Sequence, residues 1–189
     1  MKQITKSNMR YMRIMMVLGL LVISANVLAL EPAYSRKGVF TGIGLGGGVS
    51  LPLGNDTGPW GTSMDPLGDI ALDLQLGVGA SKKVTIALNV DGRLEVSNDT
   101  IGGMVVPGPE VTVFIVKGFN VHAGIGVAIT FWKDVDGAKV GMDAGAGLGY
   151  EFWVNTKWAA YMNIDFDYFL INEMPDLLTI GFWMGMRYY

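Results

Sequence analysis

The most regular feature of the chain is an alternation of apolar and polar positions between Asp69 and Val96. Nearly every second residue there is aliphatic, and the residues between are small, polar or charged. A period of two is typical of a β-strand, whose successive side chains point to opposite faces. Two such runs separated by Ser81-Lys82-Lys83 predict an antiparallel hairpin with one continuous aliphatic face.

The positions of the lysines indicate the environment of that aliphatic face. A soluble sheet normally carries some lysine in mid-strand on its wet face, whereas a membrane barrel turns apolar residues to lipid and small or polar residues inward. All lysines after the N-terminal segment fall at predicted strand ends or in connections: Lys37, Lys82, Lys83, Lys117, Lys133, Lys139 and Lys157. The pattern therefore predicts a transmembrane β-barrel.

The same alternation recurs along the chain and predicts eight strands. The hairpin supplies the second and third, and the others are expected at about Gly38 to Leu51, Glu110 to Lys117, Asn120 to Trp132, Gly141 to Phe152, Lys157 to Phe169 and Leu178 to Tyr189. Long connections are expected at Pro52 to Gly68, Ser97 to Pro109, Lys133 to Val140 and Leu170 to Leu177, alternating with three short turns. Long outer loops, short periplasmic turns and an even strand number are typical of outer-membrane barrels. We predict an all-β fold, an eight-stranded antiparallel up-and-down transmembrane β-barrel.

The N-terminal segment is expected to be a cleaved signal peptide rather than part of the fold. Four basic residues precede the apolar run Ile14 to Ile23, and Val27-Leu28-Ala29 supplies a small-residue cleavage site. The alternative is an uncleaved N-terminal anchor. We therefore predict two parts, a signal peptide over 1–29 and an outer-membrane barrel over 30–189.

Composition narrows the possible functions. The 189 residues include no cysteine, so neither a disulfide framework nor a lipid-modified cysteine anchor is available. The formal net charge is −3, and removal of the four basic residues of the signal peptide takes it to −7. An acidic balance argues against nucleic-acid binding.

Aromatic residues gather near the predicted strand ends, where the interfaces of a membrane would lie. The expected interface aromatics are Phe131, Trp132, Phe166 and Tyr168 on the outer side, and Phe152, Trp153, Trp158 and Tyr188 on the periplasmic side.

These features, together with the terminal strand TIGFWMGMRYY, resemble the small outer-membrane barrels of the OmpA-domain and OmpX type. The resemblance implies an assembly signal of alternating apolar residues ending in an aromatic, here Phe182, Met184, Met186, Tyr188 and Tyr189. It also implies an outer-membrane location and, as partners, membrane lipids, lipopolysaccharide, the barrel-assembly machinery and periplasmic chaperones. We expect a monomer.

The charged residues predicted to face the lumen form a candidate ion-pair network. Pairing the hairpin around its turn places Asp73 near Asp91, Asp69 near Glu95 and Ala71 near Arg93. We expect Arg93 to lie among these carboxylates with Asp165 and Asp167, and Glu151 to pair with Arg187 near the other rim. The alternative for the excess of carboxylates is a Ca²⁺ or Mg²⁺ site. We predict no cofactor and no catalytic or metal-binding set.

The sequence favours a structural or surface-interaction role with the lumen filled by side chains, because eight strands leave room for little else. A narrow small-solute conduit or hydrophobic-ligand pore is the first alternative. A lipid-modifying enzyme is the second, but the only histidine, His122, has no serine beside it in the sequence.

Overall fold

Eight β-strands account for most of the residues that the computed structural model describes, which are 35–53, 66–96, 101–133 and 135–189. The strands are β1 (Gly38–Leu53), β2 (Leu67–Gly79), β3 (Val84–Val96), β4 (Ile101–Val116), β5 (Phe119–Trp132), β6 (Lys139–Trp153), β7 (Trp158–Ile171) and β8 (Asp176–Tyr188). The predicted signal peptide, 1–29, lies outside the described residues. No helix in the described part of the chain is long and apolar enough to cross a membrane.

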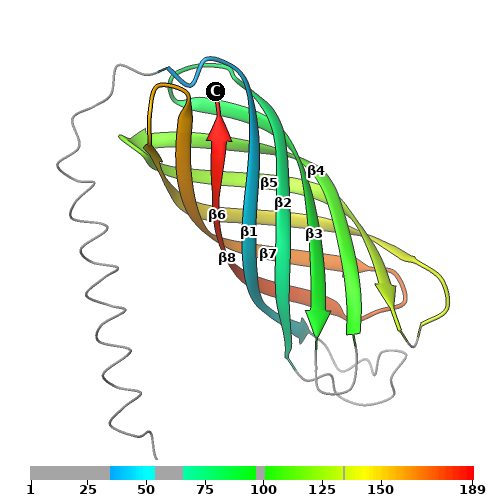
Figure 1. Cartoon of the computed structure of the whole chain (residues 1–189). Helices are drawn as coiled ribbons and strands as arrows, with labels where there is room; N and C mark the ends of the chain where they lie inside the picture. Colours follow the sequence, from blue (N-terminus) through cyan, green and yellow to red (C-terminus); the bar gives the residue numbers. More distant parts are fainter. Residues whose placement is uncertain (1–34, 54–65, 97–100, 134) are drawn as a thin grey trace, which may run out of the picture. The chain divides into compact units, whose positions relative to one another are not determined.

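The strands form a closed antiparallel barrel in sequence order, in which β8 pairs with β1 (Figure 1). Closure gives every strand two neighbours, which satisfies the backbone groups that lipid could not. The predicted fold class is therefore confirmed. The hairpin register is as predicted, with Asp73 opposite Asp91 and Asp69 opposite Glu95.

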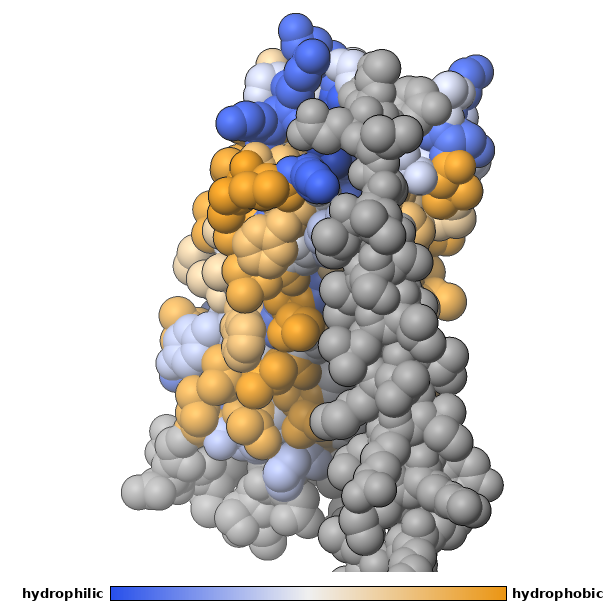
Figure 2. All heavy atoms as spheres, turned by 90° about the vertical axis from the view of Figure 1, so that its left-hand side faces the viewer, coloured by the Kyte–Doolittle hydropathy of each residue, from blue (hydrophilic) through white to orange (hydrophobic). Residues whose placement is uncertain are grey.

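Side-chain burial separates the two faces of the barrel wall. On β2 the exposed fraction of the residue falls from 71% at Ile70 to 2% at Ala71. The alternation continues along the strand, and every even-numbered residue from Ile70 to Val78 is aliphatic and exposed. The apolar side chains form a broad band on the barrel, with hydrophilic residues beyond it at the upper end (Figure 2). An apolar exterior and a polar interior are the arrangement of a transmembrane barrel.

Strand β4 is longer than the sequence pattern predicts. It was expected at about Glu110 to Lys117, with Ser97 to Pro109 as a long connection, but it begins at Ile101. Glycines and prolines between Gly102 and Pro109 have the composition of a loop. The strand nevertheless continues because β3 pairs with it throughout, while the ladder to β5 is interrupted between Val105 and Glu110. Prolines are tolerated where such a ladder is broken.

The connections differ from the predicted alternation of long and short. The β3–β4 connection contracts to 97–100 and the β7–β8 connection to 172–175, so neither is longer than the turns at 80–83 and 154–157. Only 54–66 and 133–138 exceed four residues. The upper end in Figure 1 carries the three turns and the C-terminus.

Candidate functional site

The lumen is the candidate functional site, and its inward glycines provide space for large side chains from neighbouring strands. A Cβ on Gly46 would overlap the ring of Trp183, and one on Gly77 would overlap the ring of Phe40. Each aromatic lies directly opposite its glycine in the register. Side chains from adjacent strands therefore occupy the space that these glycines leave.

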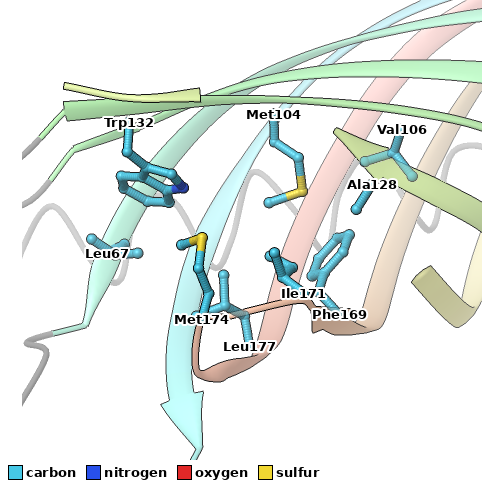
Figure 3. Packing of buried hydrophobic residues seen from close by; sticks show 9 residues of the cluster. All are labelled: Leu67, Met104, Val106, Ala128, Trp132, Phe169, Ile171, Met174 and Leu177. Carbon is cyan, nitrogen blue, oxygen red and sulfur yellow. The ribbon is translucent and has the colours of Figure 1, made fainter. Parts of the chain in front are cut away.

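An apolar cluster fills the end of the barrel opposite the three turns (Figure 3). Its members are Leu67, Met104, Val106, Ala128, Trp132, Phe169, Ile171, Met174 and Leu177, each no more than 9% exposed. Trp132, expected among the interface aromatics, lies in this cluster because its position shares the inward parity of Ala128 and Thr130.

Next to the apolar cluster, on the side toward the turns, lies a layer of charged side chains around Arg93. The nearest guanidinium nitrogen of Arg93 lies 2.5 Å from a carboxylate oxygen of Asp167 and 3.9 Å from one of Asp91. The guanidinium also lies 5.1 Å from the centre of the Phe169 ring, within range of a cation–π contact. The Ser50 hydroxyl donates to Glu95 at 3.2 Å.

Two acids that the sequence assigned to the Arg93 group contact other residues. The Oδ2 of Asp73 accepts hydrogen bonds from Gln75 at 2.6 Å and from the Tyr161 hydroxyl at 2.9 Å. Asp165 lies 2.8 Å from Nε2 of His122. The contact joins β5 to β7 across β6. Gly147 of β6 lies opposite both residues in the register and has no side chain to separate them.

A second charged group occupies the turn end of the lumen. Arg187 is 2% exposed and donates to Gln75 at 2.7 Å and to Glu151 at 3.1 Å. Glu151 also accepts hydrogen bonds from Arg36 at 2.6 Å and from the Tyr189 hydroxyl at 2.9 Å. One buried carboxylate therefore joins two arginines, which offsets the cost of burying the charges.

Between the two charged groups is a cavity of about 50 Å³, room for about three or four water molecules. Its polar lining is Asn89, Asp91, Glu110, His122, Asp143, Asp165 and Asp167. Among the described residues, no three or more acidic or histidine side chains are grouped closely enough to hold a metal ion. The chemistry available to the cavity is therefore hydrogen bonding to water.

Two contributors to these groups, Glu110 and Arg36, were not singled out from the sequence. Glu110 has the inward parity of β4, so the alternation with a correct register could have identified it. Arg36 precedes β1 and carries no periodic signal, yet its guanidinium stacks 3.7 Å from the centre of the Phe114 ring.

The predicted interface aromatics divide between the two faces of the wall. Phe131, Phe166, Trp158 and Tyr188 are exposed on the outer face, and Phe152 and Tyr168 are half-buried there. Trp153 instead shares the inward parity of Glu151 and packs 5.0 Å from the ring of Tyr189.

The terminal residues Phe182, Met184, Met186 and Tyr188 lie on the exposed outer face of β8. Tyr189 follows the strand and packs against Phe40, with ring centres 5.2 Å apart. The action of this segment as an assembly signal stays a prediction.

A closed, eight-stranded antiparallel wall with an apolar exterior defines the fold of the small outer-membrane barrels. The structure is similar to Neisserial surface protein A, with a TM-score of 0.61 and 10% identity over 80% of this chain and 99% of that one. It is also similar to Ail, the attachment invasion locus protein of Yersinia pestis, with a TM-score of 0.54 and 11% identity over 80% of this chain and 99% of that one. No protein-family model matches the sequence. No curated protein matches it either.

Proposed function

We propose that the chain is an outer-membrane barrel with a structural or surface-interaction role, whose lumen is closed by its own side chains. The observation that carries this proposal is the packing at both ends of the lumen. At the outer end, eight inward apolar residues of the strands pack together, and Met174 joins them from the β7–β8 connection. Water and ions avoid such a segment because it offers them no hydrogen bonds.

Packing at the turn end supports the same proposal. Arg36 lies over the Phe114 ring and bonds to Glu151, which in turn holds the buried Arg187. A solute entering from the periplasm would have to break these charge-assisted bonds. Function would then belong to the parts of the barrel that face outward, where connections usually carry recognition.

Single-channel recording in a planar bilayer tests the closed lumen. The folded protein should give no reproducible conductance steps in concentrated KCl. Stable, uniform steps from a preparation of folded protein would contradict the proposal.

The second candidate is a narrow conduit for small cations, which the acidic cavity favours. The cavity is lined by the carboxyl groups of Asp91, Asp143 and Asp167, so a conducting form of the barrel should prefer cations to anions. The reversal potential in a KCl gradient separates this candidate from a nonspecific leak, because only a cation-selective path shifts it toward the K⁺ equilibrium value.

An enzymatic role is not proposed. The ring nitrogens of His122 lie near Asn120 and Asp165, and the Ser50 hydroxyl is bonded to Glu95 and Thr179. A serine–histidine pair needs direct hydrogen-bond contact, and no such contact joins His122 to a serine in the described ranges.

Neighbours named for surface roles give the interaction proposal its direction without specifying a ligand. Neisserial surface protein A is named for the cell surface, and Ail for attachment and invasion. A surface-binding role for this chain would be tested by comparing adhesion of cells that express it with cells that express a variant lacking residues 54–65.

A further inference from the structure

The turn end of the barrel carries a ring of exposed positive charge. We define this lysine collar as Lys37, Lys82, Lys83, Lys117 and Lys157, all of which are exposed. The acidic side chain Glu151 at this end is 1% exposed and is bonded to two arginines. Among the described residues, the exposed carboxylates Asp136 and Glu173 lie in the connections at the opposite end.

Backbone hydrogen bonds hold the collar in place around the wall. The carbonyl oxygen of Lys83 accepts a bond from the amide of Phe114 at 2.7 Å, and that of Lys157 accepts one from the amide of Tyr189 at 2.8 Å. All three turns at this end carry at least one lysine. The positive charges are therefore spread around the perimeter rather than gathered on one side.

Exposed aromatics lie beside the collar and mark the depth of a membrane interface. The rings of Trp158 and Tyr188 meet edge to face at 5.1 Å, and Nζ of Lys157 lies 5.9 Å from the centre of the Tyr188 ring. Phe119, 41% exposed, follows the turn that contains Lys117. Tryptophan and tyrosine favour the headgroup level, and lysines next to them extend their ammonium groups toward phosphates.

We propose that the lysine collar binds the headgroups of anionic phospholipids, such as phosphatidylglycerol, in the leaflet that surrounds the turns. The assignment to the periplasmic leaflet rests on the outer-membrane barrel proposed above. A soluble acidic protein fits the arrangement less well, since the charges encircle the wall immediately beyond its apolar band. Each lysine near an anionic surface is expected to favour binding by about fivefold.

The test measures which lipids stay with the protein. The folded barrel is reconstituted into bilayers of equal phosphatidylethanolamine and phosphatidylglycerol, and the fraction of each spin-labelled lipid immobilised at the protein surface is measured at low and high salt. The collar variant carries Lys82→Gln, Lys83→Gln, Lys117→Gln and Lys157→Gln. A control for position carries Lys133→Gln, a single lysine of the opposite end, and heat-dependent gel migration confirms that each variant is folded.

We expect the wild type and the control to select phosphatidylglycerol several-fold over phosphatidylethanolamine at low salt, and the collar variant to lose most of that selection. High salt should weaken the selection, because it screens exposed charges. Equal immobilisation of both lipids by the wild type would overturn the proposal. So would a collar variant as selective as the control. Neither outcome depends on whether the lumen conducts ions, so failure of the lipid-binding proposal can be told apart from failure of the closed-lumen proposal.

Discussion

Replacing Arg93 with methionine tests the charged layer of the lumen most sharply. The Arg93 side chain is 3% exposed and lies 2.5 Å from Asp167 and 3.9 Å from Asp91. Methionine keeps much of the aliphatic volume but leaves the two carboxylates without their cation. Removing one partner of a buried ion pair costs about 3–5 kcal/mol, since the remaining charge is uncompensated. Arg93→Met should therefore lower the free energy of unfolding by about that amount.

Urea unfolding in phospholipid bilayers or bilayer mimics, followed by tryptophan fluorescence, measures this loss. The matched control is the double variant Arg93→Met with Asp167→Asn, which removes both charges of the short pair. The double variant should recover at least about 1 kcal/mol relative to the single variant, because replacing a whole buried pair is often close to neutral. A single variant as stable as the wild type, or a double variant no better than the single one, would refute this account of the layer.

Three further substitutions test the two faces of the barrel wall, the close packing over an inward glycine, and the ion pair at the end opposite the turns. Leu74→Arg puts a cation on the lipid face and should cost about 2–4 kcal/mol near the midplane, whereas Leu74→Met should cost less than about 1.5 kcal/mol in the same urea titration; equal losses would mean that the faces are reversed. Gly147→Ala places a methyl group against the carboxylate of Asp165 and should lower the free energy of unfolding by about 1–3 kcal/mol. Unchanged urea unfolding would show that the lumen at Gly147 can accommodate a methyl group. Lys139 lies 2.5 Å from Glu173, and its hydrogen bond and positive charge hold the pKa of that exposed carboxyl below the ordinary value. The stability that the pair contributes is therefore fully present above the unfolded pKa of Glu173 and is lost as the pH falls through its folded pKa. An NMR titration should give Glu173 a lower midpoint than in Lys139→Gln, and identical midpoints would contradict this expectation.

The sequence determined most of the barrel wall because the period of two requires only local information. The register of β2 and β3 followed from the turn at 80–83, so the Asp73–Asp91 pairing could be predicted from spacing alone. The first half of β4 could not be predicted. Its prolines and glycines favour a loop locally, and pairing with neighbouring strands holds it extended: β3 pairs with every residue from Ile101 to Val113, and β5 pairs with Gly102 to Val105.

The lumen was harder to predict because its contacts depend on three strands at once. Parity placed His122 and Asp165 inside the barrel, but their contact also requires Gly147 to lie between them in the register. The position of Arg36 was inaccessible to a strand-based pattern, since it lies before β1 and enters the turn end of the lumen from outside the wall.

The transmembrane orientation of the wall is the central claim, and single-cysteine labelling tests it directly. The chain contains no cysteine, so a spin label can be placed at one position at a time from Ile70 to Val78 without background. In reconstituted bilayers, labels at the even positions should be relaxed mainly by oxygen, which concentrates in lipid. Labels at the odd positions should be shielded from lipid-borne oxygen. A profile with the opposite parity, or one with no period of two, would contradict the membrane-spanning barrel.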